Sequence, residues 1–211
     1  MSGITGKQTE KYLYSLLPAR DPLLREMEGY AARHGVPIVG PACGRLLYQL
    51  ASLIGARRIF EMGSAIGYST LWLARAAGPS GTVFYTDGDP ANARRAEGYF
   101  RRAGVLDRIR ILPGDALQSL NSTEGQFDLI FNDVDKIQYP QVFRLAVPRL
   151  RSGGLFIADN VLLSGRPAKP ALKRDARTRA IQEFNRLIYR SRELFTTIVP
   201  LRDGFSICMK H

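Results

Sequence analysis

Two acidic segments in the middle of the 211-residue chain contain residue types that could hold a metal ion. Asp133 follows the mostly apolar run 127–131 after a single asparagine, and Asp159-Asn160 directly follows the apolar run 155–158. Carboxylate and amide oxygens suit Mg²⁺, Ca²⁺ or Mn²⁺ better than zinc. If the two runs are neighbouring parallel strands, their carboxyl ends meet at one edge of the sheet, and Asp133, Asp159 and Asn160 are predicted to bind such a cation. Helix caps or turns at ordinary strand ends are the alternative interpretation.

Lys136 lies three residues after Asp133 and is a candidate general base. A lysine with the usual pKa of about 10.4 is a poor base at neutral pH. A nearby divalent cation and partial burial both disfavour the charged form and lower the pKa. Lys136 would then be able to take a proton from a hydroxyl held by the metal. The spacing alone favours a simpler role, which is a salt bridge to Asp133 or Asp135.

Three turns at the ends of expected strands point to a cofactor site. The first contains Gly63 and Gly67, and glycine at a strand-to-helix turn lets backbone approach a ligand closely. Asp87 ends the next expected strand, 20 residues after Gly67, where a carboxylate can accept hydrogen bonds from both hydroxyls of a ribose. The third turn is Gly114-Asp115-Ala116, which is placed to contact an adenine. Together the turns predict a cofactor that carries adenosine.

Familiar phosphate-binding motifs are absent from the sequence. Neither the dinucleotide pattern G-x-G-x-x-G nor the nucleotide-hydrolysing pattern G-x-x-x-x-G-K-[ST] occurs. The cofactor is therefore expected to need no pyrophosphate site. Asp89, which precedes Pro90, is interpreted as a helix cap, and Asp115 fits the same role. Capping by Asp115 is compatible with ligand contact.

Short apolar runs alternate with amphipathic stretches from residue 57 onward, which predicts a parallel sheet with helices on both faces. The expected strands are 58–62, 82–86, 108–112, 127–132 and 155–158, and the expected helices are 69–77, 90–103, a short one around 117, and 137–150. A helix at 177–190 and strands at 195–200 and 205–209 follow, with the turn signal Asp203-Gly204 between the two strands. The predicted fold class is α/β, a Rossmann-like, doubly wound, mostly parallel sheet with a C-terminal antiparallel hairpin and N-terminal helices.

The first third of the chain reads as helical. Asp21 is a plausible N-cap before Pro22, and Gly35 fits the end of the helix that starts there. A chain of this length suits one domain. We therefore expect a single domain, with a helical cap at residues 1–55 and a Rossmann-like core at residues 56–211.

The formal net charge of the chain is +11, and it is unevenly distributed. Residues 166–192 contain nine basic and two acidic side chains, a net charge of +7. Positive charge of this density favours phosphate-bearing or carboxylated partners. A solvated, arginine-rich surface is the simpler interpretation.

No run of about 18 apolar residues and no secretion signal is seen, so a cytoplasmic location without membrane contact is expected. Cys43 and Cys208 are far apart in the sequence and neither has a metal-ligand neighbour. They are interpreted as reduced, structural thiols.

Taken together, the motifs resemble the catechol and caffeoyl-CoA type of class I S-adenosylmethionine-dependent O-methyltransferases, in particular small bacterial members. The likeness runs from about Pro37 to the C-terminus. It rests on the segments 61–69, Asp87, 114–116, 131–136 with Tyr139, 152–154, 159–162 with Gly165, Phe184-Asn185, and Pro200 with Asp203-Gly204.

The resemblance implies methyl transfer from S-adenosylmethionine to a substrate oxygen, in line with the sulfonium bond. Asp133, Asp159 and Asn160 would hold Mg²⁺ or another divalent cation, and Lys136 would be the general base. The residues implied to line the cofactor pocket are Val39, Glu61, Gly63, Ser69, Asp87, Gly114, Asp115, Ala116 and Asp133. A small catechol-like or hydroxylated aromatic substrate with neighbouring oxygens is expected, and members of this type are commonly homodimers.

The sequence departs from the family pattern in four places. Ala65 replaces the middle glycine of the cofactor turn, and Asn132 replaces an apolar strand residue. Leu163 stands where plant enzymes often carry tryptophan, and residues 166–174 are unusually basic. The last two features argue against a plant-like or catechol-like substrate, and a 5-hydroxyuridine of tRNA is an alternative methyl acceptor. A Rossmann nucleotide-binding protein without methyltransferase activity is the second alternative.

Overall fold

The computed structural model describes residue 4 and residues 6–211. The chain forms two compact units. The first unit is residues 16–123, and the second unit joins the N-terminal residues up to Ser15 with residues 124–211. The division into a cap at 1–55 and a core at 56–211 stays a prediction.

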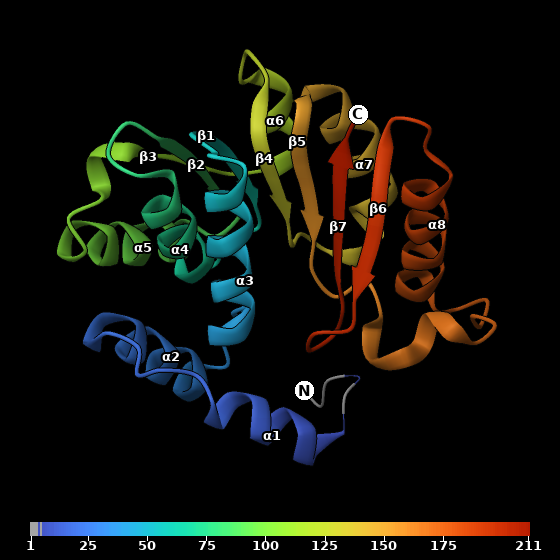
Figure 1. Ribbon diagram of the computed structural model, residues 1–211, viewed down its shortest axis with the longest axis horizontal. Helices are drawn as coiled ribbons and strands as arrows, with labels where there is room; N and C mark the ends of the chain where they lie inside the picture. Colours follow the sequence, from blue (N-terminus) through green and yellow to red (C-terminus); the bar gives the residue numbers. More distant parts are fainter. Residues whose placement is uncertain (1–3, 5) are drawn as a thin grey trace. The chain divides into compact units, whose positions relative to one another are not determined.

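The first unit contains three parallel strands in the order β3-β2-β1 (Figure 1). The strands are β1 (Arg58–Met62), β2 (Thr82–Asp87) and β3 (Ile109–Pro113). The helices are α2 (Pro22–His34), α3 (Gly40–Leu53), α4 (Tyr68–Ala77), α5 (Pro90–Arg102), the 3₁₀ helix η1 (Leu106–Arg108) and α6 (Ala116–Ser122). Met62 pairs with Thr86, and Thr86 pairs with Leu112. The carboxyl ends of all three strands therefore lie together.

The second unit contains two parallel strands followed by an antiparallel hairpin, in the order β4-β5-β7-β6 (Figure 1). The strands are β4 (Phe127–Asn132), β5 (Leu150–Ala158), β6 (Leu194–Val199) and β7 (Phe205–Lys210). The helices are α1 (Lys7–Ser15), α7 (Tyr139–Ala146), α8 (Ala176–Arg190) and the 3₁₀ helices η2 (Lys136–Gln138), η3 (Val147–Arg149) and η4 (Leu163–Ala168). Helix α8 packs against α7 and β6, as the ribbon shows. The predicted class, α/β with mostly parallel strands and a C-terminal antiparallel hairpin, is confirmed.

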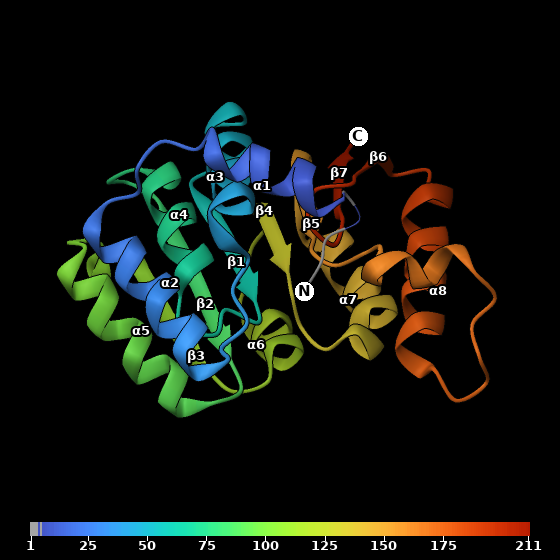
Figure 2. The same cartoon turned by 90° about the horizontal axis from the view of Figure 1, so that it is seen from below.

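Local signals in the sequence explain several helix boundaries. The Asp21 side chain accepts a hydrogen bond of 2.9 Å from the backbone N–H of Leu24, so it caps α2 as predicted. Helix α2 runs beside α5 in Figure 2. Two side chains of α5 hold this contact, because the Arg95 guanidinium lies 4.0 Å from the centre of the Tyr30 ring and Arg102 pairs with Glu26 at 2.5 Å. The N-terminal helices predicted from the sequence are confirmed.

The expected helix 137–150 is wrong as a single element. The segment is η2, α7 and η3 in succession, and α7 and η3 each carry proline in their first turn, at Pro140 and Pro148. Proline lacks the N–H that would continue a preceding helix, so it starts a new one. Strand β5 also begins earlier than expected, at Leu150, since its first half includes a bulge opposite β4.

Both cysteines are buried and free, as predicted for structural thiols. Burial raises the pKa of the Cys208 thiol to about 11, which keeps it protonated and unreactive at neutral pH. Within residue 4 and residues 6–211, no helix is long and apolar enough to cross a membrane.

Candidate active site

The turn after β1 is fixed by hydrogen bonds to β2. The N–H of Ser64 donates to the carbonyl of Thr86 at 2.9 Å, and the Tyr85 hydroxyl donates to the carbonyl of Ala65 at 2.6 Å. Gly67 closes the turn with a φ of +81° and forms the N-cap of α4. Ala65 has a φ of +45°, which lies in a region that favours glycine. The backbone of the turn therefore keeps a conformation suited to the family's glycine, and alanine adopts it with some strain.

Asp87 joins the three predicted cofactor turns. Its Oδ2 accepts a 2.8 Å hydrogen bond from the N–H of Ala65, and its Oδ1 accepts from the N–H of Asp89 and the amide of Asn92. The carbonyl of Asp87 accepts from the N–H of Gly114 at 2.8 Å. The structure therefore brings Asp87 together with the turns that contain Gly63 and Gly114, as predicted from the sequence.

The two neighbouring aspartates are helix caps. Asp89 accepts from the N–H of Ala91 at 2.8 Å at the start of α5, and Asp115 accepts from the N–H of Gln118 at 2.8 Å at the start of α6. Both capping interpretations are confirmed. Ala116 follows Asp115 and is buried in the first turn of α6.

The remaining predicted cofactor residues of the first unit are buried. Glu61 lies within β1 and is fully buried, and its carboxylate accepts a hydrogen bond from the hydroxyl of Thr70. Ser69 is buried in the first turn of α4, and Val39 is buried at the start of α3. Asp133 belongs to the second unit, and its part in cofactor binding stays a prediction.

Replacing Gly67 with alanine is expected to destabilise the cofactor turn. The added Cβ would lie 2.4 Å from Cζ of Phe100, and the φ of +81° disfavours any side chain. Strain and overpacking together predict a loss of about 2–5 kcal/mol in the free energy of unfolding, measured by urea titration. Gly98→Ala is the control, because Gly98 lies within α5 with nothing within 4 Å of the added Cβ and should gain up to about 1 kcal/mol. Equal stability of the two variants would contradict the turn geometry described above.

In the second unit, Lys136 links the two acidic segments. Its Nζ donates to Oδ1 of Asp133 at 2.6 Å and to the Tyr139 hydroxyl at 3.0 Å. The Tyr139 hydroxyl in turn donates to the backbone carbonyl of Asp159 at 2.7 Å. The backbone also joins the segments, since the N–H of Asp159 donates to the carbonyl of Asn132 at 3.1 Å. The predicted metal ligands and the predicted base are therefore brought together.

Burial and mutual repulsion govern the charges of the two carboxylates. Burial, followed by the charge of Asp133, raises the pKa of Asp159 to about 7. Burial also raises the pKa of Asp133, although Lys136 opposes this shift. Two ionised carboxylates close together in a buried place favour a cation between or beside them.

Lys136 is held in its charged form. Burial lowers the pKa of Lys136, as expected, but Tyr139 and Asp133 outweigh burial and raise the pKa above its ordinary value. The predicted salt bridge to Asp133 is present, whereas Asp135 pairs with Arg177 at 2.6 Å instead. Lys136 is a poor base while Asp133 is its partner, and a cation bound to that carboxylate would offset the negative charge that stabilises the charged amine.

The loop after β5 is clamped by the hairpin between β6 and β7. Asn160 has a φ of +57°, and its N–H donates to Oδ1 of Asp159 at 2.6 Å. The N–H groups of Val161 and Leu162 donate to the carbonyls of Gly204 and Asp203 at 3.1 and 2.9 Å. A Cβ on Gly204 would lie 2.5 Å from Cγ of Leu162, so glycine is needed for this close approach. The hairpin thereby fixes the loop that carries Asn160.

Four residues near the acidic segments have roles that sequence reasoning missed. Tyr139 positions Lys136, and Asp203 accepts a hydrogen bond from the N–H of Ser164. Arg202 lies close enough to lower the pKa of both Asp133 and Asp159. Asn132 is fully buried, and its amide nitrogen and oxygen have no hydrogen-bond partner among the residues that the structure describes. Asp203 and Arg202 sit in the predicted hairpin turn, and only the topology of the sheet brings that turn to the acidic loop.

Among the described residues, no group of three or more His, Cys, Asp and Glu side chains is arranged to hold a metal. The predicted set differs from such a group because it has two carboxylates and one amide. Asn160 is half-buried, and its side-chain amide makes no hydrogen bond within the described part of the chain. Two carboxylates and one amide oxygen suit a cation that binds few protein oxygens and keeps several water ligands. Mg²⁺ usually binds in this way.

Comparison with known proteins identifies the family. The model of the O-methyltransferase family matches residues 18–211. The catechol O-methyltransferase of Niastella koreensis is 35% identical over 166 residues, which are 76% of this chain and 75% of that protein. The crystal structure of an O-methyltransferase from Bacillus cereus in complex with SAH has a TM-score of 0.88 and 31% identity, and the match covers 97% of each chain. TomG, an O-methyltransferase of Streptomyces achromogenes crystallised with SAM, has a TM-score of 0.87 and 29% identity, with 96% of each chain covered.

The fold and these comparisons thus define a Rossmann-like methyltransferase. The chain belongs to the O-methyltransferase family. The resemblance, the fold class and the enzyme class predicted from the sequence are confirmed, and the alternative of a Rossmann nucleotide-binding protein without methyltransferase activity is wrong.

Proposed function

We propose that the protein transfers a methyl group from S-adenosylmethionine to a hydroxyl of a small catechol-like or hydroxylated aromatic compound, and that it needs a divalent cation. The observation that carries this proposal is the pair of interacting carboxylates, half-buried Asp133 and buried Asp159, with Lys136 beside them. The direct test is methyl transfer from labelled S-adenosylmethionine to catechols, with and without a chelator. Transfer that survives thorough chelation would contradict the metal requirement.

The first unit is proposed to bind S-adenosylmethionine around Asp87. Relatives of the same family were crystallised with SAM or SAH, which supports this cofactor. Each carboxylate oxygen has two lone pairs, so Oδ2 of Asp87 can keep its bond to Ala65 and still accept from a ribose hydroxyl. Asp87 would then hold both the turn and the ribose.

Asp87→Ala is expected to weaken S-adenosylmethionine binding by a few kcal/mol, since hydrogen bonds to a charged group contribute about 1.5–3 kcal/mol each. Titration calorimetry on the folded variant measures the loss. Asp89→Ala is the matched control, because Asp89 caps α5 with a single hydrogen bond to Ala91 and is not proposed to touch the ribose. If Asp89→Ala weakens binding more than Asp87→Ala does, the ribose site has been assigned to the wrong aspartate.

Asp133, Asp159 and Asn160 are proposed to hold the cation, because their oxygens suit Mg²⁺ and the two carboxylates lie close enough for the charge of Asp133 to raise the pKa of Asp159. When bound, a divalent cation supplies positive charge that lowers the pKa of a neighbouring substrate hydroxyl. Its preference for two adjacent oxygens favours substrates with vicinal hydroxyls or a hydroxyl beside a carbonyl.

Lys136 is proposed to take the proton of the reacting hydroxyl. Tyr139 fixes the direction of the Lys136 amine, because its hydroxyl is anchored on the carbonyl of Asp159. Most of the Lys136 side chain is shielded from water, with 16% of it exposed, which limits exchange of the proton with solvent. Positioning of the two reactants would supply much of the remaining reduction of the barrier.

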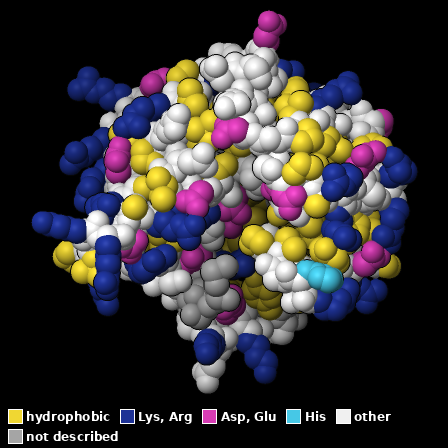
Figure 3. Space-filling view, turned by 180° about the vertical axis from the view of Figure 1, so that it is seen from behind, with side chains coloured by type: hydrophobic (Ala, Val, Ile, Leu, Met, Phe, Trp, Pro, Cys, Tyr) yellow, Lys and Arg dark blue, Asp and Glu magenta, His cyan; other side chains and the backbone are white. Residues whose placement is uncertain are grey.

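A hydroxylated uridine of tRNA is the second candidate acceptor, and the net charge of +7 over residues 166–192 favours it. Lys and Arg side chains also project from many places along the margin of the face drawn in Figure 3, with Asp and Glu between them. Parallel assays with small catechols and with hydroxylated tRNA discriminate between the two acceptors. A homodimer is proposed on the family resemblance alone, and light scattering coupled to size-exclusion chromatography tests it.

A further inference from the structure

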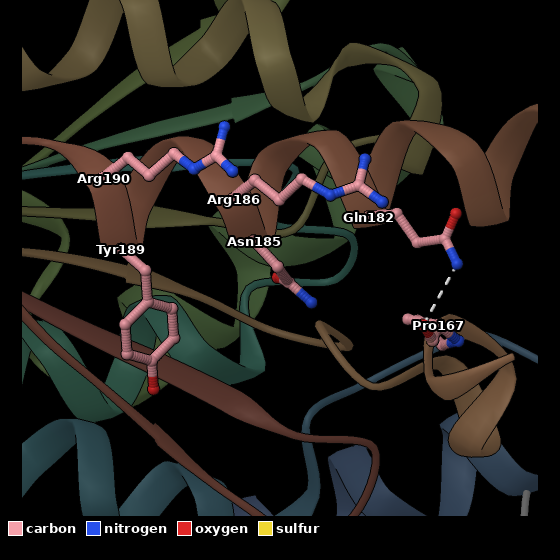
Figure 4. Close-up of a pocket in the computed structure, with 6 residues that line it drawn as sticks. All are labelled: Pro167, Gln182, Asn185, Arg186, Tyr189 and Arg190. Atoms are coloured by element: carbon pink, nitrogen blue, oxygen red, sulfur yellow. Dashed lines mark hydrogen bonds between the residues drawn. The ribbon is translucent and has the colours of Figure 1, made fainter.

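A pocket of about 360 Å³ lies along α8 in the second unit. Figure 4 shows the residues that line it, which are Pro167, Gln182, Asn185, Arg186, Tyr189 and Arg190. The Gln182 amide donates to the carbonyls of Pro167 and Lys169 at 3.0 and 2.8 Å, so one wall of the pocket is held in place. None of these residues is used in the cofactor and metal sites proposed above.

Two arginines of the pocket carry charge that the protein does not neutralise. Arg186 and Arg190 are one helical turn apart, and their side chains extend along α8 in the same direction in Figure 4. Neither guanidinium has an ion pair or hydrogen bond within the part of the chain that the structure describes. The acidic side chain of α8, Glu183, pairs with Arg144 at 3.0 Å. The pair of free guanidiniums therefore favours an anionic ligand.

The pocket also offers an aromatic surface. The Asn185 amide nitrogen donates to the carbonyl of Val161 at 2.8 Å, which fixes this part of the pocket wall. Tyr189 has 56% of its surface exposed, and its hydroxyl accepts from the N–H of Ile198 at 3.1 Å, so the ring is anchored.

We infer that this pocket binds the phosphoryl group of a nucleotide, with Arg186 and Arg190 on the phosphate and Tyr189 beneath the base. Arginine pairs match the geometry of phosphate oxygens, and an exposed tyrosine ring is a usual platform for a base. The volume lies in the range of about 300–1,000 Å³ that is typical of small-ligand sites. A free nucleotide and a nucleotide within RNA share this chemistry.

Uridine monophosphate is the probe, and the protein is first saturated with S-adenosylhomocysteine so that the cofactor site is filled. Calorimetry should detect binding of uridine monophosphate and weaker binding of inorganic phosphate and of uridine. The double variant Arg186→Gln with Arg190→Gln should lose at least about tenfold in affinity for uridine monophosphate, because two charge-assisted hydrogen bonds are removed. Tyr189→Leu should weaken binding of the nucleotide but leave binding of inorganic phosphate unchanged.

The matched control is Lys173→Gln with Arg174→Gln, which removes two exposed charges from the same basic segment without touching the pocket. Its affinity should change by less than about twofold at physiological salt. Equal losses in both double variants, or no binding of the nucleotide by the wild type, would overturn the inference. A short oligouridylate that binds more tightly than the monophosphate identifies RNA as the source, and equal affinity identifies a free nucleotide. Both of these outcomes retain the pocket as the phosphate site.

Discussion

Asp159→Asn is expected to abolish metal-dependent methyl transfer while the protein stays folded. Asparagine has the shape of the native side chain but lacks its charge, and the native charge is unfavourable here, since burial and Asp133 raise the pKa of Asp159 to about 7. The variant should therefore be at least as stable as the wild type without metal. If the cation contributes several kcal/mol to the reaction, the rate should fall by ~10³-fold or more.

Thermal unfolding supplies a measurement of the cation that does not depend on activity. At a Mg²⁺ concentration near 100 times Kd, binding should raise the Tm of the wild type by roughly 5–10 °C. Asp159→Asn should lose most of that shift and keep its affinity for S-adenosylmethionine.

Asp135→Asn is the control for this experiment. Asp135 lies in the same acidic segment, but its carboxylate pairs with Arg177 on the surface. This variant should retain both the Mg²⁺ shift and the rate. If Asp135→Asn loses them and Asp159→Asn does not, the ligand set has been assigned to the wrong carboxylates.

The sequence locates the candidate site residues at the ends of strands, but it does not predict the contacts around them. Asp87 and Asp159 could be found because each stands where a strand ends, and within each unit the parallel strands bring such ends together. Asp203 and Arg202 could not be assigned a role in this way. They belong to a hairpin turn more than 40 residues from the acidic loop, and only the antiparallel pairing of β7 with β5 brings the two segments together.

Two further limits of the sequence have physical causes. Helix 137–150 was predicted as one element because its apolar spacing is continuous, but Pro140 and Pro148 each restart the helix. The charge state of Lys136 depends on its hydrogen bond to the Tyr139 hydroxyl and on its ion pair with the Asp133 carboxylate. Neither can be read from the spacing of lysine and aspartate, which is the same in a salt bridge and in a catalytic pair.

Lys136→Met is expected to slow the chemical step by ~10²–10⁴-fold, which is the usual contribution of a general base. Methionine preserves much of the packing of the lysine stem but accepts no proton. Affinity for S-adenosylmethionine should be unchanged, since Lys136 is not proposed to touch the cofactor. Single-turnover methyl transfer with saturating cofactor isolates the chemical step from product release.

The competing role for Lys136 is a structural salt bridge to Asp133, and a second lysine provides the comparison. Lys210 is shielded to nearly the same degree, with 17% of its side chain exposed against 16% for Lys136, and it donates to the carbonyls of Val147 and Leu150 at 2.9 and 3.1 Å. Lys210→Met should therefore lower the Tm and leave the single-turnover rate unchanged. Tyr139→Phe removes the hydroxyl that orients Lys136, so it should slow transfer less than Lys136→Met does. If Lys136→Met behaves like Lys210→Met, with a lower Tm and a wild-type rate, Lys136 is a structural residue and the proton is taken by another group.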